Sequence, residues 1–364
     1  MTINDIFKEA VARGASDVHI LVGEPPIIRI NGQLTRLEKF GVIDKKKAEA
    51  LILSLLDSQQ KEKYLHKKEL DLSHQLSNKE RYINYRELDI SHQIESNDRF
   101  RINLHFEKGN PSLVARVIST KIPTLEEIGM PPVVYQLINL KQGLIIITGP
   151  TGCGKSTSLA AMINTINTER TCNIITLEDP IEFIFPRKKS IVRQRQYGFD
   201  FISFPDALKH VLRQDPNVIM VGEMRDLETI AATITLAETG HLVMATLHTP
   251  NAAQTIDRII DIFPPHQQDQ IRIQLSMSLV GVIAQQLLPT KDDKDRIAAR
   301  EIMINTPAVA NLIRENKIAQ IKTVIQTSSD EQMISMDQSI EILYKQGFID
   351  KETAQQYMTD NIIK

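Results

Sequence analysis

The residue types best suited to chemistry form one continuous run near the middle of the chain. The run matches the phosphate-binding pattern G-x-x-x-x-G-K-[ST] and consists of Gly149, Pro150, Thr151, Gly152, Cys153, Gly154, Lys155, Ser156 and Thr157. Its glycines let the backbone fold around an anion, and the helix expected from Ser156 onward adds the positive end of its dipole. Lys155 would reach the β- and γ-phosphates, and the Ser156 hydroxyl would ligate Mg²⁺. The pattern therefore predicts a site for ATP and Mg²⁺.

Carboxylates follow two of the expected strands and could activate the attacking water. Glu178 and Glu182 lie at and beyond the end of a strand expected near 173–177, and Glu223 follows the apolar run 217–221. Ligands of open parallel sheets bind at the carboxyl ends of the strands, so these side chains should face the nucleotide. An apolar run that ends in an acid is Walker-B-like, which places Glu223 near Mg²⁺. Any of the three could be the general base, and the sequence leaves that choice open.

Two histidines, His241 and His248, bracket the strand expected near 242–246. A single histidine at such a position is more often a structural residue than a catalytic one. Two of them beside a P-loop favour a γ-phosphate sensor, because a histidine can donate to a phosphoryl oxygen and move when it leaves.

These residues need a scaffold of alternating strands and helices. Short apolar strands are expected near 144–148, 173–177, 217–221 and 242–246. This spacing is typical of a doubly wound parallel sheet. We therefore expect an ATPase core at 136–305, followed by a helical region at 306–364.

Residues 1–120 are predicted to form a separate α/β domain, joined to the core by a proline-punctuated linker at 121–135. Helices are expected at the N-terminus and at 44–65. Asn31-Gly32 predicts a two-residue hairpin turn after a strand at 27–30. Further strands are expected at 17–22 and near 87–94, 99–106 and 112–118.

A short internal repeat relates residues 61–76 to residues 79–94. One repeated pair is too little for a solenoid, so we interpret it as a local duplication of unknown function. The repeated His74 and His92 are more simply surface strand residues than metal ligands.

Composition excludes several classes of protein. The 364 residues carry a net charge of −2 and no Trp, which disfavours nucleic-acid binding. The two cysteines form no CxxC pair, so a structural zinc site is not expected, and isolated thiols suit a reducing cytoplasm. No apolar run approaches the roughly 18 residues of a membrane span, and the N-terminus does not resemble a signal peptide. Any membrane role should therefore be peripheral.

Taken in order, these motifs resemble the secretion and type IV pilus ATPase superfamily, and within it the twitching-motility (PilT-type) retraction ATPases. The resemblance covers nearly the whole chain. It is carried by the P-loop and by the segments 15–19, 99–103, 178–182, 212–226, 237–249, 311–315 and 336–338.

The resemblance implies a PAS-like N-terminal α/β domain and a C-terminal RecA-like P-loop ATPase domain with a helical tail. It also implies a homo-hexameric ring with ATP between the two domains, and arginines of the N-terminal domain that reach the nucleotide. The matching positions are Arg101 and Arg116, which without the resemblance would be taken as surface arginines. Such a motor would couple hydrolysis to interdomain motion and drive pilus retraction through an inner-membrane platform protein. It would lie in the cytoplasm, at the inner face of the cytoplasmic membrane.

The chain departs from the family pattern at two positions. Ala310 stands where the tail motif has its first arginine, and Cys153 replaces the usual P-loop serine. One alternative is a PilU-like accessory ATPase of low activity, joined to a paralogous ring. Another is a pilus-assembly or type II secretion ATPase, although those usually add a further N-terminal domain and a tetracysteine insertion. A nucleic-acid translocase on the same fold is disfavoured by the charge balance.

Overall fold

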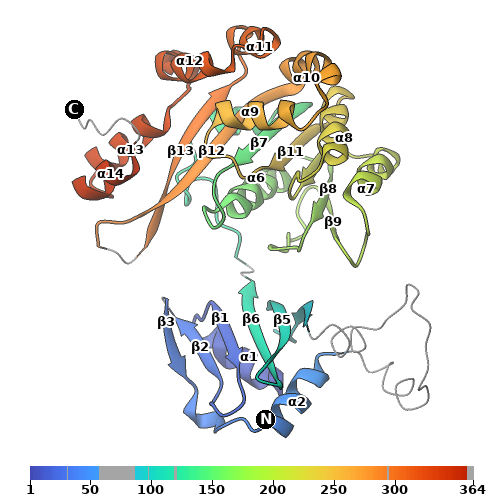
Figure 1. Cartoon of the computed structure of the whole chain (residues 1–364), viewed down its shortest axis with the longest axis vertical. Coiled ribbons are helices and arrows are strands. Elements are labelled where there is room, and N and C mark those ends of the chain that lie inside the picture. Colours follow the sequence, from blue (N-terminus) through green and yellow to red (C-terminus); the bar gives the residue numbers. More distant parts are fainter. Residues whose placement is uncertain (31, 57–86, 97, 119–120, 293–294, 359–364) are drawn as a thin grey trace. The chain divides into compact units, whose positions relative to one another are not determined.

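The computed structural model describes residues 1–30, 32–56, 87–96, 98–118, 121–292 and 295–358. The chain divides into two compact units, Met1–Lys121 and Ile122–Lys364 (Figure 1). Each unit has its own sheet with helices packed against it. The mixed α/β class predicted from the sequence is confirmed.

The first unit is built on an antiparallel sheet. Within the described ranges its six strands lie in the order β3-β2-β1-β6-β5-β4. The elements are α1 (Ile3–Ala12), β1 (Asp17–Ile20), β2 (Ile27–Ile30), β3 (Gln33–Arg36), η1 (Glu38–Phe40), α2 (Lys45–Ser54), β4 (Glu87–Gln93), β5 (Arg99–Glu107) and β6 (Asn110–Ile118).

Local sequence explains how this unit starts. Thr2 and Asp5 form a capping box at the beginning of α1, whose buried residues Ile3, Ile6, Phe7 and Ala10 follow helical spacing. Ile30 pairs with Gln33, as expected for the predicted two-residue turn.

Part of the sequence prediction lies outside the described residues. The helix expected at 44–65 is seen as α2, which ends at Ser54, and residues 57–86 are not described. The first copy of the repeat, with His74, falls in that range. His92 lies on β4, half-buried, with Nε2 2.9 Å from Asn4 Oδ1.

The second unit is built on a mostly parallel sheet with strand order β13-β12-β7-β11-β10-β8-β9 among the described residues. The pairing of β12 with β13 is antiparallel, and the others are parallel. The strands are β7 (Gly143–Thr148), β8 (Asn173–Glu178), β9 (Ile191–Gln196), β10 (Val218–Val221), β11 (Leu242–Thr246), β12 (Leu279–Pro289) and β13 (Arg296–Ile304).

Helices cover both faces of this sheet (Figure 1). On β7, Leu144 and Ile146 belong to one buried apolar cluster, and Ile145 and Ile147 belong to another on the opposite face. The helices are α5 (Val133–Ile138), α6 (Lys155–Glu169), α7 (Phe204–Val211), η3 (Leu212–Gln214), α8 (Leu227–Glu238), α9 (Ala252–Asp261) and α10 (Pro265–Ser278). The predicted doubly wound sheet is confirmed, and β9, β12 and β13 extend it beyond the strands expected from the sequence.

The region after β13 is helical, as predicted. It contains α11 (Pro307–Arg314), η4 (Ile318–Gln320), α12 (Ile321–Thr327), η5 (Ser329–Glu331), α13 (Met336–Lys345) and α14 (Lys351–Tyr357). At the other end of the unit, Leu125 and Met130, from the segment that the sequence analysis treats as a linker, are buried in the core. In the described parts of the chain, no helix combines the length and apolar character that a membrane crossing requires.

Candidate nucleotide-binding site

The P-loop connects β7 to α6 at the carboxyl edge of the parallel sheet. Gly149 has φ +140°, and a Cβ there would lie 2.2 Å from the Gln285 main-chain oxygen on β12. Gly154 precedes α6 with φ +88°. Both positions require glycine, because the backbone is in a left-handed conformation and β12 lies directly behind the loop. The first N–H groups of α6 lack acceptors within the helix and so favour an anion.

Lys155 is buried beneath the loop that it helps to form, with only 8% of its surface exposed. Its Nζ donates to the main-chain oxygens of Gly149 (2.8 Å) and Pro150 (3.0 Å). It also lies 3.3 Å from His248 Nδ1.

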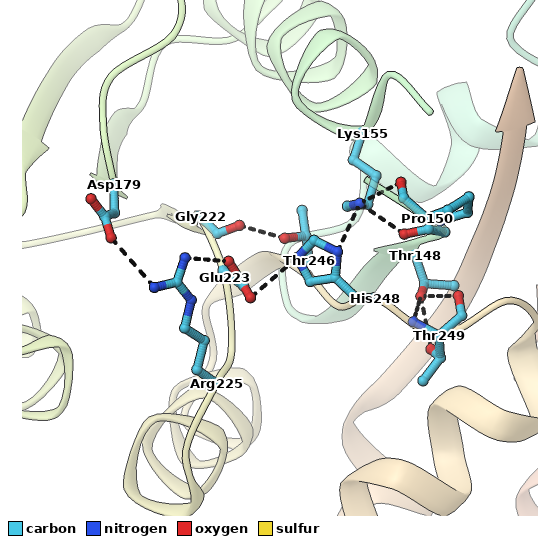
Figure 2. A network of polar contacts seen from close by, with 11 residues as sticks. Thr148, Pro150, Lys155, Asp179, Gly222, Glu223, Arg225, Thr246, His248 and Thr249 are labelled. Carbon is cyan, nitrogen blue, oxygen red and sulfur yellow. Dashed lines mark hydrogen bonds and ion pairs between the residues drawn. The ribbon is translucent and has the colours of Figure 1, made fainter. Parts of the chain in front are cut away.

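A chain of polar contacts continues from His248 to the next strands (Figure 2). Because an ammonium group only donates, Nδ1 of His248 accepts from Lys155 and the ring proton lies on Nε2. Nε2 is 3.1 Å from Glu223 Oε1. The other oxygen of Glu223 is 2.8 Å from Arg225, which also lies 3.7 Å from Asp179. The structure thus links the P-loop lysine to the acid expected after β10.

The surroundings of these groups shift their pKa values. Burial lowers the pKa of Lys155. Burial alone would raise the pKa of Glu223, but the charge of Arg225 and hydrogen bonds from Arg225 and His248 outweigh it and lower the pKa overall. Glu223 is therefore held in its charged form, which suits an interaction with a metal ion or a polarised water.

The other two candidate carboxylates lie in different environments. Glu178 ends β8 and is 6% exposed, and its Oε1 accepts from Thr176 (2.6 Å) and Gln194 (3.1 Å). Burial raises the pKa of Glu178. Glu182 is exposed on the loop after β8. Neither belongs to the chain of contacts that links Lys155 to Arg225, although both follow the carboxyl end of β8.

The two histidines lie at opposite ends of strand β11. His248 follows β11, whereas His241 precedes it and accepts at its main-chain oxygen from Gly143 N (3.0 Å). Nδ1 of His241 lies 3.0 Å from the Leu236 main-chain oxygen. Because a five-residue strand spans about 17 Å, one chain cannot bring both rings to one phosphate. Within one chain, the two predicted sensor histidines therefore lie apart, and only His248 lies beside Lys155.

Arg101 and Arg116 lie in the first unit, directly opposite each other on β5 and β6. Asp17 is the cross-strand neighbour of Arg116 on β1, and its Oδ1 is 3.0 Å from Arg116 Nε. Arg29 on β2 lies 3.8 Å from the other oxygen of Asp17. Three arginines and one acid thus form a row across four strands. Asp17 lies within the segment 15–19 that carries the resemblance, but its contact with Arg116 depends on strand pairing and was not predicted.

The remaining P-loop residues divide into an exposed tip and a supported base. Pro150, Thr151 and Gly152 are exposed, whereas Ser156 and Thr157 are partly buried at the start of α6. Cys153 is 3% exposed, and burial raises the pKa of its thiol. The serine-to-cysteine departure therefore places a neutral thiol inside the loop rather than a reactive group at the surface.

Gln285 supports the base of the P-loop, a role that was not predicted from the sequence. Its side-chain amide donates to the Cys153 main-chain oxygen and accepts from Ser158 Oγ (2.8 Å). Thr148, at the end of β7, similarly donates to the Thr249 main-chain oxygen (2.6 Å). No local pattern marks these residues, since both contacts join segments more than 100 residues apart.

Two cavities border this region. One, of about 840 Å³, is lined by residues that include Gly154, Thr157, Ser158, Leu287 and Arg300. It opens beside the first turn of α6. A smaller cavity of about 350 Å³ lies next to Asp179, Glu223 and Arg225.

Comparisons with known proteins agree with this geometry. A family model described as Type II/IV secretion system protein matches residues 1–350. The chain is 40% identical to the type IV pilus retraction ATPase PilT of Pseudomonas aeruginosa over 98% of both sequences. It is 38% identical to the type IV pilus ATPase PilU of the same species, over 97% of this chain and 88% of PilU. A crystal structure of the pilus retraction motor PilT with bound ADP is 42% identical, with a TM-score of 0.86 over 99% of this chain and 98% of that one. The resemblance inferred from the sequence is confirmed.

Proposed function

The chain belongs to the type II/IV secretion system protein family, and we propose that it hydrolyses ATP to power the retraction of type IV pili. The observation that carries this proposal is the match to a retraction ATPase over 98% of both sequences. The buried P-loop lysine with its His248–Glu223 link supports the hydrolytic part of the proposal independently of any relative.

In this proposal the P-loop binds the phosphates of ATP. The N–H groups at the start of α6 and the ammonium group of Lys155 would contact phosphate oxygens. The nucleoside would occupy the cavity of about 840 Å³ beside Thr157 and Ser158. His248, which already contacts Lys155, would sense the γ-phosphate.

The donor set near the P-loop fits Mg²⁺. The Ser156 hydroxyl and the charged carboxylate of Glu223 are hard oxygen donors, and Mg²⁺ commonly uses one or two protein ligands together with substrate phosphates. When bound, Mg²⁺ would bridge the phosphates and neutralise part of their charge. Arg225 would keep Glu223 oriented toward that position.

We assign the water-activating role to Glu223 rather than to Glu178 or Glu182. In the sheet, β10 is two strands from β7 and β8 is three strands away. With a spacing of about 4.8 Å per strand, Glu223 starts roughly 5 Å closer to the P-loop. Glu178 is also hydrogen-bonded to Thr176 and Gln194 rather than to the residues around Lys155.

The same proposal extends to the assembly. The first unit, residues 1–120, would act as the PAS-like domain and residues 136–305 as the RecA-like core, joined through 121–135 and followed by the helical region. In a homo-hexameric ring, Arg101 and Arg116 would neutralise charge that develops on the γ-phosphate. The ring would lie at the cytoplasmic face of the inner membrane and pass its motion to a pilus platform protein.

A PilU-like accessory subunit is the second candidate, because the chain is nearly as similar to PilU as to PilT. The two functions differ in intrinsic turnover. An accessory ring would assemble but hydrolyse little ATP alone.

Steady-state ATP hydrolysis by the purified full-length chain tests the proposal. Lys155→Ala should abolish turnover, whereas Lys141→Ala, a change at an exposed lysine before β7, should not. Oligomer size is measured on the same samples. Hexamers with Lys155-dependent turnover support a self-sufficient motor. Hexamers without it favour the accessory subunit, and full activity of Lys155→Ala would overturn the P-loop assignment.

A further inference from the structure

Arg300, in the antiparallel strand β13, is a buried cation without a buried anion to balance it. Only 3% of the surface of Arg300 is exposed. Within the described ranges, its side-chain hydrogen bonds go to the Gln285 amide oxygen and the Gly129 main-chain oxygen, not to a carboxylate. Burial lowers the pKa of its guanidinium to about 10, and Cys153 acts in the opposite direction. An arginine in such surroundings remains charged at neutral pH, so the charge is carried into the interior at a cost in stability.

The contacts of Arg300 lead to the P-loop. Nε donates to Gln285 Oε1 (3.1 Å), and the same oxygen accepts from Ser158 Oγ (2.8 Å) in the first turn of α6. The Gln285 amide donates to the Cys153 main-chain oxygen. One side chain therefore separates the guanidinium from both the loop and the start of its helix.

Arg300 also keeps donors that these contacts do not use. Besides the bond to Gln285, Nη1 donates to the Gly129 main-chain oxygen (3.1 Å). A guanidinium has five N–H donors, so these two hydrogen bonds use fewer than half of them. Arg300 lines the cavity of about 840 Å³ together with Gly154, Thr157 and Ser158. The charge of Arg300 thus borders the cavity that Gly154, Thr157 and Ser158 line, whose lining also includes the carboxylates Glu126 and Glu127.

A purely structural role explains this arrangement poorly. Holding the Gly129 oxygen and the Gln285 amide requires only neutral donors, and a neutral side chain would avoid the cost of a buried charge. An anion in the cavity would balance that charge, and the N-terminal end of α6 favours an anion at the same place.

We infer that Arg300 is a binding residue for the phosphate chain of a nucleoside diphosphate or triphosphate, at the α-phosphate end beside Thr157. This inference rests on the proposed nucleotide site. It adds a contact from β13, outside the P-loop and outside the motifs that carry the family resemblance.

The test is ADP binding to the full-length chain, measured by competition with a fluorescent ADP analogue, together with the unfolding midpoint without nucleotide. Arg300→Met removes the charge and keeps most of the length. We expect ADP affinity to fall by about tenfold or more, as for a lost charge-assisted hydrogen bond. The unfolding midpoint should stay unchanged or rise, because an unbalanced buried charge is gone. A structural role predicts the reverse, with a lower midpoint and affinity within about twofold of wild type, and that result would overturn the inference.

Arg170→Met is the matched control. Arg170 also donates to main-chain oxygens, those of Ile138 and Leu140, but it lies just after the far end of α6. The Arg170→Met variant should have a lower unfolding midpoint and an unchanged affinity for ADP. If Arg300→Met lowers both quantities, Arg300→Lys decides, because recovered ADP affinity supports a phosphate contact and equal loss excludes it. Failure of the wild-type chain to bind ADP would instead refute the nucleotide site itself.

Discussion

Arg101 and Arg116 lie directly opposite each other on the neighbouring strands β5 and β6, although 15 positions separate them in the chain. Like charges at opposed positions destabilise a sheet. Asp17 contacts Arg116 and so offsets part of this repulsion. In the proposed ring, the phosphates of ATP would offset the rest of this repulsion.

Replacing Arg101 with alanine should therefore separate catalysis from stability. We expect kcat for ATP to fall by about 10²-fold or more, because an arginine at the γ-phosphate stabilises transition-state charge. Nucleotide binding and the unfolding midpoint should stay near wild type. Arg36→Ala, at an exposed arginine on β3 that pairs with Glu24, is the control. Unchanged turnover in Arg101→Ala would mean that the arginine is structural.

The Glu223→Gln variant tests the assignment of the water-activating carboxylate. The change keeps the shape of the side chain and removes the charge that Arg225 and His248 stabilise. We expect kcat to fall by at least about 10²-fold while ATP still binds. Glu228→Gln, at an exposed position in the first turn of α8, controls for loss of a nearby carboxylate. A Glu223→Gln enzyme with nearly full turnover would return the role to Glu178 or Glu182.

His248→Ala should weaken the coupling between the P-loop and Glu223. The ring contacts Lys155 through one nitrogen and Glu223 through the other, so its loss breaks both contacts. We expect a fall in kcat of about tenfold or more with a smaller change in ADP affinity. His266→Ala, at an exposed histidine on α10, is the control. Equal losses in both variants would argue against a specific role.

The burial of Glu178 predicts a pH dependence of stability. Burial raises its pKa above the ordinary 4.5, so the folded chain holds this proton more tightly than the unfolded chain. The carboxylate therefore costs stability progressively as pH rises above 4.5 and through the raised folded-state pKa. Glu178→Gln should be more stable relative to wild type at pH 8 than at pH 5. Urea denaturation of both proteins at the two pH values measures this difference, and an equal difference at both values would contradict the prediction.

Much of the ATPase unit could be predicted from local sequence. The run from Gly149 to Thr157 lies between β7 and α6 as expected, because its glycines and the apolar segments beside it act over neighbouring residues only. The strands containing Ile175, Ile219 and Met244 were predicted for the same reason, since each is a short apolar run. The strands β9, β12 and β13 were not predicted; β13 pairs with the adjacent β12, and β12 joins the sheet through β7, which lies far away in the chain.

The sequence by itself determined three things: the presence of a P-loop, the acidic residues that follow its strands, and the family that the chain resembles. Tertiary structure decided which of those residues meet. Strand order and the parallel direction of the strands bring His248 and Glu223 to the carboxyl ends of the strands, where Lys155 lies. They place His241 at the amino ends. Long-range packing also places Asp17 against Arg116 and Arg300 against Gln285. Such contacts depend on how distant segments are packed, and neither residue type nor local spacing encodes that packing.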